Sequence, residues 1–286
     1  MARIAYANGR YLSIGEAAVA LEDRGYQFAD GVYEVVKTVA GVPRDLERHL
    51  DRLERSLEGL RIAMPMSRTA LKRVILETLK RNAIRHAIVY VQVSRGTAPR
   101  NHVFPRKAVP SLVVTVRRAP FPKPDEIENG VGVITLPDQR WKRCDIKSIS
   151  LLPNVLAKQQ AAEQGAREAW LFDADGLVTE GSSANAYIVD QAGTIVTRPL
   201  GPEILGGITR QNLFAAATAL GIPIEERPFS VEEAKEAREA FLTSTSSLVL
   251  PVTRIDDRSI GNGKPGSITR RLLDAYLEAQ GLADVI

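Results

Sequence analysis

Residues 143–148 read Arg-Cys-Asp-Ile-Lys-Ser, and residues 179–185 read Thr-Glu-Gly-Ser-Ser-Ala-Asn. The first stretch holds Lys147 in a short segment with apolar flanks, and the second holds Glu180 at the edge of a Gly/Ser loop. Considered alone, a lysine near a strand end is usually a surface residue, and an acid at a strand end is usually solvated. The two become informative because other stretches of the chain supply the remaining parts of one kind of site.

A lysine that acts as a nucleophile must be uncharged, which requires burial or a nearby positive charge. Enzymes that use pyridoxal 5'-phosphate (PLP) need such a lysine to form an imine with the cofactor aldehyde. They also need an acid that keeps the pyridine nitrogen protonated. We therefore expect Lys147 to be the nucleophile and Glu180 to pair with the pyridine nitrogen. Lys158, on a predicted helix, and Lys107, in a basic loop, have no acid partner near them in the sequence.

The composition is that of a globular protein. The chain has 286 residues, 44% of them hydrophobic and 25% charged, and a length of this order favours about two domains. No apolar run approaches the length of a membrane span, and the N-terminus turns polar before a signal-peptide core could form. The single cysteine, Cys144, excludes an internal disulfide framework. These features favour a cytoplasmic protein.

The charge pattern argues against two classes of partner. The net charge of +4 is mild, and basic and acidic residues alternate, so neither a basic stripe nor interleaved aromatics predicts nucleic-acid binding. The three histidines are not paired at metal-ligand spacing, which argues against a catalytic zinc site. We expect small-molecule substrates and no metal.

The first part of the chain mixes strands and helices. β-Prone runs predict strands, and periodic apolar residues predict helices. In the predicted helix 45–60, five leucines form one stripe, while Arg52 lies well off it and is available for another contact. The predicted strands are 10–14, 31–39, 87–93 and 111–116, and the predicted helices are 45–60 and 68–82.

Residues 119–124 read Ala-Pro-Phe-Pro-Lys-Pro, and so many prolines disfavour both helix and central strand. We therefore place a linker at 119–124, between a domain of residues 1–118 and a domain of residues 125–286. In the second domain, Asn154 after Pro153 predicts a helix start. The predicted strands there are 132–136, 170–172, 177–179, 186–189, 194–197 and 240–243, and helices are predicted over 154–164 and 208–221, from 230 and over 268–281.

Three further stretches carry groups that can bind a phosphate. Residues 205–209 read Leu-Gly-Gly-Ile-Thr and place two glycines directly before a helix, where exposed amides attract anions. Residues 243–247 are all serine or threonine, and Arg52 can add a bidentate positive charge. Each feature taken alone also fits a helix cap, a polar loop or a surface arginine.

Arg100 and His102 are two residues apart, so on an extended segment both side chains point the same way. Together with Tyr33 they could bind a substrate carboxylate through guanidinium, imidazole and phenol groups. Taken alone, His102 is more simply a loop histidine.

These motifs, in this order along nearly the whole chain, resemble the fold-type IV PLP aminotransferases, and among them the D-amino-acid aminotransferase branch. The matching stretches are Gly31–Glu34, His49–Leu53, Arg95–His102, Cys144–Ser148, Glu180–Asn185, Gly207–Arg210 and Thr243–Ser246. One departure is Leu248, where the family often has glutamate after the hydroxyl cluster. We expect the phosphate site to tolerate this change.

The resemblance implies a role for each candidate residue. Lys147 would be the Schiff-base lysine, Glu180 would pair with the pyridine nitrogen, and Leu205 would pack against the ring. The phosphate would be held by Arg52, Ile208, Thr209, Ser244 and Thr245. The substrate carboxylate would be bound by Tyr33, Arg100 and His102. In the family the arginine and the histidine come from the other subunit, which implies a homodimer.

The implied fold is a mixed α/β (α+β) fold with a small α/β N-terminal domain, a larger barrel-like C-terminal domain and PLP between them. The implied reaction is transamination between a D-amino acid such as D-alanine and a 2-oxo acid such as 2-oxoglutarate. A branched-chain L-amino-acid aminotransferase, an (R)-amine transaminase and an aminodeoxychorismate lyase share the same core and remain alternatives. A catalytically silent PLP-binding or scaffold protein is an alternative of a different class.

Overall fold

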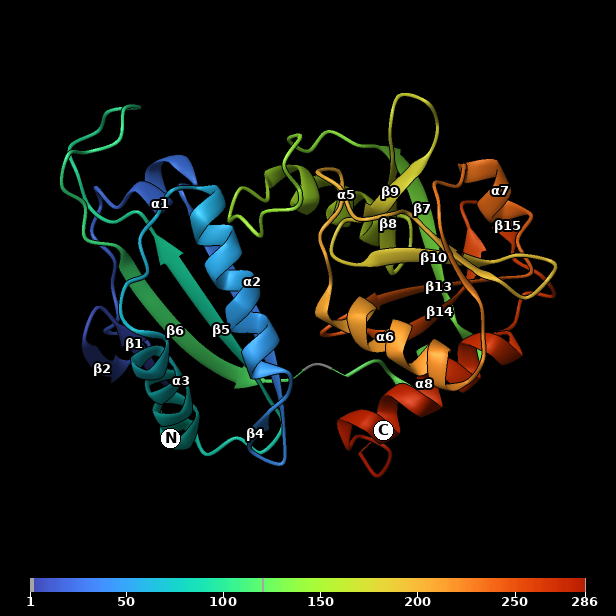
Figure 1. Cartoon of the computed structure of the whole chain (residues 1–286), viewed down its shortest axis with the longest axis horizontal. Coiled ribbons are helices and arrows are strands. Elements are labelled where there is room, and N and C mark those ends of the chain that lie inside the picture. Colours follow the sequence, from blue (N-terminus) through green and yellow to red (C-terminus); the bar gives the residue numbers. More distant parts are fainter. Residues whose placement is uncertain (1–2, 120, 286) are drawn as a thin grey trace. The chain divides into compact units, whose positions relative to one another are not determined.

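The computed structural model describes residues 3–119 and 121–285 (Figure 1). The chain divides into two compact units. The N-terminal unit comprises Met1–Pro120 and Ile146–Ser150, and the C-terminal unit comprises Phe121–Asp145 and Leu151–Ile286. Residues 1, 2 and 286, as well as Pro120 in the predicted linker, lie outside the described residues.

The N-terminal unit is built on a six-stranded sheet in the order β2-β1-β6-β5-β3-β4, in which every neighbouring pair is antiparallel. The central strands β3 and β5 are rich in valine, which suits a pleated, half-buried surface. They pair from Gly31 opposite Ser94 to Thr38 opposite Ala87. The strands are β1 (Ile4–Ala7), β2 (Arg10–Ser13), β3 (Gly31–Val39), β4 (Val42–Pro43), β5 (Ala87–Ser94) and β6 (Ser111–Arg118).

Helices cover this sheet through the leucine stripe predicted from the sequence. The unit has α1 (Arg24–Phe28), α2 (Leu46–Gly59) and α3 (Arg68–Asn82), and α2 packs against β3 while α3 packs against β6 and β1. In α2, Leu50, Leu53 and Leu57 are fully buried in the core of the unit, which confirms the stripe. The two outer leucines of the stripe, Leu46 and Leu60, pack against the same core while staying partly exposed.

A short segment, Ile146–Ser150, belongs to the N-terminal unit although its neighbours on both sides belong to the other unit. It lies along β3: Tyr33 N donates to Lys147 O at 3.0 Å, and Ile149 N donates to Gly31 O at 3.0 Å. The predicted domain boundary at 119–124 placed this segment in the C-terminal domain. Pairing between residues that are distant in sequence leaves no local pattern from which its true position could be predicted. The segment carries Lys147, so the backbone of the candidate nucleophile is fixed by hydrogen bonds to a central strand.

The C-terminal unit is built on a nine-stranded mixed sheet that curls into a half-barrel. The strands run in the order β12-β11-β10-β13-β14-β7-β8-β9, and β15 pairs with β14. The strands are β7 (Val131–Pro137), β8 (Glu168–Phe172), β9 (Val178–Gly181), β10 (Asn185–Val189), β11 (Ile195–Thr197), β12 (Ile224–Glu226), β13 (Glu239–Ser244), β14 (Leu248–Ile255) and β15 (Arg258–Ser259). A small α/β unit followed by a larger, barrel-like one confirms the predicted fold class.

Five helices flank this sheet: α4 (Pro124–Asn129), α5 (Leu152–Glu163), α6 (Ile208–Ala219), α7 (Val231–Lys235) and α8 (Ser267–Gln280). Two predictions about where helices begin are wrong. Helix α4 begins at Pro124, inside the segment in which prolines were taken to exclude a helix, and α5 begins two residues before Asn154. Proline is tolerated in the first turn, where its missing N–H has no helical partner. Asn154 does not cap α5, and its Nδ2 donates to Ser182 O at 2.8 Å.

No helix within residues 3–119 and 121–285 is both long and apolar enough to cross a membrane.

Candidate functional site

Lys147 and Tyr33 lie together in the N-terminal unit. The Nζ atom of Lys147 is 4.3 Å from the centre of the Tyr33 ring, and its backbone N donates to Ser56 Oγ at 3.2 Å. Tyr33 in turn stacks on Tyr90, with ring centres 5.5 Å apart. The structure thus brings together the predicted nucleophile and one of the three residues predicted to bind the substrate carboxylate.

Arg52 is buried between α2 and β3, where Glu34 accepts two hydrogen bonds from it. Arg52 Nε lies 2.7 Å from Glu34 Oε1, and Arg52 Nη2 lies 2.8 Å from Glu34 Oε2. His49 Nδ1 lies 2.7 Å from the same Oε2. Burial alone would raise the pKa of Glu34, but the charge and hydrogen bonds of Arg52 and His49 lower it to about 2. Glu34 is therefore ionised near neutral pH and orients the guanidinium of Arg52.

Arg100 and His102 lie in an exposed loop and share one contact, the ring of Phe28 at the end of α1. Arg100 Cζ is 4.6 Å from the ring centre, and the His102 ring centre is 5.3 Å away. Buried Arg24 also lies over Phe28, at 4.8 Å, and donates to the backbone carbonyls of Asn101 and His102. Both side chains therefore contact the same aromatic ring.

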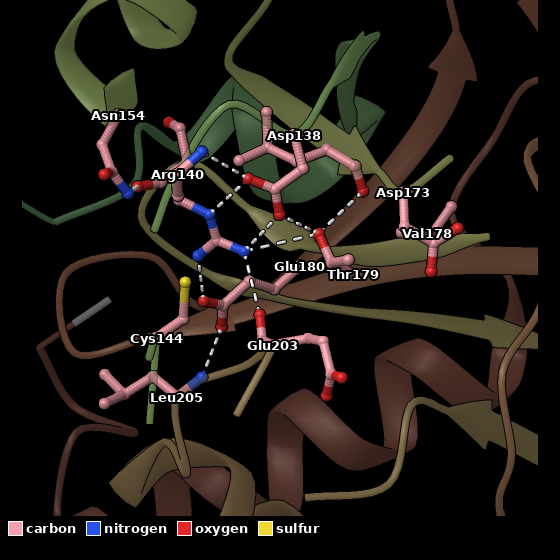
Figure 2. Close-up of polar contacts among 12 residues, drawn as sticks. Asp138, Arg140, Cys144, Asn154, Asp173, Val178, Thr179, Glu180, Glu203 and Leu205 are labelled. Carbon is pink, nitrogen blue, oxygen red and sulfur yellow. Dashed lines mark hydrogen bonds and ion pairs between the residues drawn. The ribbon is translucent and has the colours of Figure 1, made fainter. Parts of the chain in front are cut away.

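Glu180 is buried at the end of β9 in the C-terminal unit, and donors surround its carboxylate (Figure 2). Arg140 Nη1 donates to Oε1, while Asn185 Nδ2 and the backbone N of Leu205 donate to Oε2 at 3.0 and 3.1 Å. A carboxylate with a guanidinium partner and two amide donors is stabilised as the anion. This is the form that a protonated pyridine nitrogen would pair with.

Asn185 joins the separate motifs of the C-terminal unit. Its Nδ2 also donates to Leu205 O at 2.9 Å, and a Cβ on Gly207 would overlap its Oδ1. On β10, Asn185 lies opposite Thr243 of β13, directly before the hydroxyl-rich turn. The amide thus connects the acid with the glycine loop, and the strand that carries it pairs with the strand that leads into the hydroxyl cluster.

The glycine loop and the hydroxyl turn supply donors suited to a phosphate. Gly207 is the N-cap of α6 and has no side-chain cap, and Ile208 and Thr209 form the buried first turn. In the hydroxyl turn, Ser244 Oγ accepts from Ser247 N at 2.9 Å, and the neighbouring Thr245 is half-buried. Backbone amides at a helix start together with hydroxyl groups match a phosphate dianion. The residues of this unit therefore fit the ring and the phosphate of PLP.

Leu248, the departure from the family pattern, ends the hydroxyl turn. It is fully buried and has a φ of 59°, in the left-handed region that leucine rarely adopts. It pairs with Ser244 across the β13–β14 hairpin. The turn therefore closes with a residue held in a strained conformation by its surroundings.

Sequence reasoning missed the charged residues that support the site, namely Arg140, Asp138 and Glu34. Glu34 is fully buried and pairs directly with Arg52, 18 residues away in the sequence. Arg140 pairs with Glu180, 40 residues away, and Asp138 binds Arg140. The Asp138-x-Arg140 pair directly after β7 is a local signal that could have drawn attention. Nothing in its spacing points to Glu180, however.

Comparisons with known proteins match one family along most of the chain. The family model described as amino-transferase class IV matches residues 31–255. The D-alanine aminotransferase of Bacillus licheniformis is 44% identical over 269 residues, which are 94% of this chain and 94% of that protein. The D-alanine aminotransferase of Staphylococcus haemolyticus is 39% identical over 272 residues, 95% of each chain.

Two solved structures have the same fold. The branched-chain amino acid aminotransferase of Escherichia coli superposes with a TM-score of 0.91 at 21% identity, covering 99% of this chain and 96% of that one. A second branched-chain amino acid aminotransferase, that of T.th. with pyridoxamine 5'-phosphate, has a TM-score of 0.90 at 27% identity and covers 99% and 95%. At 21% identity the first likeness concerns the fold alone.

Proposed function

Because the chain belongs to the class IV aminotransferases, which use PLP, we propose that it transfers the amino group of a D-amino acid such as D-alanine to a 2-oxo acid such as 2-oxoglutarate. The observation that supports this choice of substrate is the 44% identity, over 94% of both chains, to a D-alanine aminotransferase. The contacts that gather Arg100 and His102 on Phe28 fit the same choice, since a guanidinium and an imidazole together suit a carboxylate.

When bound, PLP supplies an aldehyde that an amine can bond and a ring that withdraws electrons from the bond to the α-proton. In our proposal the Nζ atom of Lys147 would hold the cofactor through its aldehyde carbon and would move the α-proton of the substrate. Its backbone hydrogen bonds to β3 and Ser56 restrict where the amine can reach. Glu180 holds the ring nitrogen protonated, and Leu205 packs against the ring.

The proposal also names the groups that would bind the phosphate of PLP. We assign it to the Arg52 guanidinium, the amides of Ile208 and Thr209 at the start of α6, and the hydroxyl groups of Thr209, Ser244 and Thr245. Arg52 is well suited because Glu34 fixes its orientation through two hydrogen bonds. The substrate carboxylate is assigned to Tyr33, Arg100 and His102.

We also propose that the enzyme is a homodimer in which Arg100 and His102 serve the site of the other subunit. Exposed apolar side chains support an interface. On α5, Leu152, Val155 and Leu156 are 68%, 57% and 59% exposed, and their spacing places them on one face. A cytoplasmic location suits a chain whose one cysteine can form no internal disulfide.

The assignment of Lys147 is tested by reducing the holoenzyme with borohydride and mapping the pyridoxyl label by peptide mass spectrometry. The label is expected on the peptide that contains Lys147, and Lys147→Ala should lose both the label and turnover. Lys142→Ala, which removes an exposed lysine nearby, is the matched control and should keep both. A label attached to another lysine would overturn the assignment.

Substrate choice is tested by assaying D-alanine, L-leucine, a chiral amine and aminodeoxychorismate side by side, followed by chiral analysis of the product. The proposal expects D-alanine to be the preferred donor. Preferential turnover of L-leucine would identify a branched-chain aminotransferase instead, and the other two donors would identify the remaining alternatives. Bound PLP without any keto-acid product would indicate a silent binding protein.

A further inference from the structure

Arg140 is the buried centre of a polar network in the C-terminal unit (Figure 2). Its Nε donates to Asp138 Oδ1 at 3.0 Å, and its Nη2 donates to Asp138 Oδ2 at 2.7 Å and to Glu203 O at 3.0 Å. Its Nη1 donates to Glu180 Oε1. The side chain is only 6% exposed, so these contacts form in an environment in which charges interact strongly.

Building on the role proposed for Glu180, we propose that Arg140 is a positioning residue that decides which partner holds the proton shared by Glu180 and the pyridine nitrogen of bound PLP. Next to a guanidinium the carboxylate is stabilised as the anion, so the proton stays on the nitrogen. A neutral neighbour would let Glu180 hold the proton, which would leave the ring uncharged and less able to withdraw electrons.

The rest of the network fixes where the arginine points. Thr179 Oγ1 donates to Asp138 Oδ2 at 2.7 Å and thereby orients the carboxylate that holds Arg140 from the side opposite Glu180. Burial by itself would raise the pKa of Asp138, but the hydrogen bonds and charge of Arg140 lower it. Burial would likewise lower the pKa of Arg140, whereas Asp138 and Glu180 raise it. The arginine is therefore positively charged near neutral pH.

Two titratable groups near Glu180, Cys144 and Tyr187, carry no positive charge of their own. Burial raises the pKa of the Cys144 thiol to about 12, although Arg140 opposes the shift. Burial also raises the pKa of Tyr187 to about 12. Both groups are therefore neutral near pH 7, and Asp138 adds a negative charge rather than a positive one. The positive charge of Arg140 is thus well placed to control the ionisation of Glu180.

The decisive measurement is the ¹⁵N chemical shift of the ring in holoenzyme loaded with PLP labelled at the pyridine nitrogen. The wild type should give the signal of a protonated ring, and Arg140→Gln should move it toward the unprotonated position. The dissociation constant of PLP should rise about 10- to 100-fold, the range expected for losing a charged hydrogen-bond partner. Arg198→Gln is the matched control, because Arg198 pairs with Asp173 at 2.9 Å in the same unit.

Two further variants separate positioning from a merely structural role. Arg140→Lys keeps the positive charge but not the bidentate geometry, so the pyridine ring of PLP bound to this variant should stay protonated. If Arg140→Gln does not fold, Arg140→Lys still provides a test. In a Glu180→Gln background, Arg140→Gln should add little to the loss of PLP affinity, because the two residues act on the same proton. An unchanged ring signal in Arg140→Gln, an unprotonated ring in Arg140→Lys, or additive losses of affinity would each overturn the inference.

The results that would reject the proposed function differ from those that would reject only the role of Arg140. Wild-type protein that bound no PLP, or whose pyridoxyl label lay elsewhere than on Lys147, would remove the premise whatever Arg140 does. Wild-type protein that transaminates D-alanine while Arg140→Gln keeps a protonated ring would leave the proposed function intact and reject only the role of Arg140.

Discussion

At the scale of single residues, the buried carboxyl group of Glu34 allows a prediction of how the free energy of unfolding depends on pH. Its pKa is lowered to about 2 in the folded protein from an ordinary value of 4.5. A carboxyl group whose pKa is lower in the folded protein contributes its full stabilisation at a pH above its pKa in the unfolded chain. It loses that contribution as the pH falls through its pKa in the folded protein. The contribution of Glu34 is therefore lost between about pH 4.5 and pH 2, and is on the order of 3 kcal/mol.

Urea unfolding of the apoprotein at several pH values between 5 and 2 checks this expectation. The difference in unfolding free energy between the wild type and Glu34→Gln should be largest at about pH 5 and shrink as the pH falls. Glu47→Gln is the comparison, because Glu47 is paired with Arg68 and Lys72 but is exposed. A difference that stayed constant over this range would mean that Glu34 is not held ionised by Arg52.

Arg100 carries a prediction about substrate recognition. Arg100→Ala should raise the KM for D-alanine and lower kcat/KM about 10- to 100-fold, the cost of one charge-assisted hydrogen bond to a carboxylate. The absorbance of the bound cofactor should be unchanged, because Arg100 has no assigned contact with it. Arg106→Ala, in the same exposed loop, should behave like the wild type. Equal losses in both variants would show that loop order, and not the guanidinium of Arg100, is what matters.

The sequence predicted these site residues but not the charged residues that pair with them. The helical pattern of residues 45–60 correctly set Arg52 apart from the leucines, but Glu34, which fixes its orientation, lies on β3. Likewise the motif around Glu180 indicates an acid, whereas Arg140 comes from the loop after β7. Ion pairs between residues that the fold brings together leave no mark in local spacing.

At the scale of elements, the start of α6 depends on a close approach. A Cβ on Gly207 would overlap Oδ1 of Asn185, the same amide that binds Glu180 and Leu205. Gly207→Ala must therefore displace either the helix start or the amide that holds the acid. We expect it to weaken PLP binding by about tenfold or more, since about 1.4 kcal/mol already corresponds to that factor.

Equilibrium dialysis of the apoprotein with PLP measures this loss. Gly206→Ala is the matched control, because a Cβ there would meet only Leu200 Cδ2, at the ordinary contact distance of 3.6 Å. Its effect should be several times smaller. If the two variants lost the same affinity, the flexibility of the glycine pair would matter more than the approach of Asn185.

Most elements were predictable because each has its own period or its own cap. The leucine stripe predicted α2, valine-rich runs predicted β3 and β5, and Ser230 with Glu233 predicted α7, whose N-cap does accept from Glu233 N at 3.0 Å. The order of the strands was not predictable. β7 pairs in parallel with both β14 and β8, and no single run of sequence records such neighbours.

At the scale of the whole molecule, the exposed apolar face of α5 allows a test of whether the chain forms a homodimer. Ala157 and Ala161 of this helix are buried in a small core with strands β7 and β8, whereas Leu152, Val155 and Leu156 are left exposed. Apolar side chains gathered on one exposed helix face are costly in water unless something covers them. A second copy of the chain would cover them in the proposed homodimer.

Light scattering coupled to size-exclusion chromatography should therefore give the mass of a dimer for the wild type. The variant Leu152→Asp/Leu156→Asp should be a monomer, because burying two carboxylates in an apolar interface is unfavourable. Ala215→Asp/Thr218→Asp adds the same charge to two exposed positions on another helix, α6, and should remain a dimer. Since Arg100 and His102 are proposed to act across the interface, the monomer should also lose D-alanine transamination while keeping its fold by circular dichroism. A monomeric variant with full activity would place both residues in the site of their own chain, and a dimeric one would place the interface on another face.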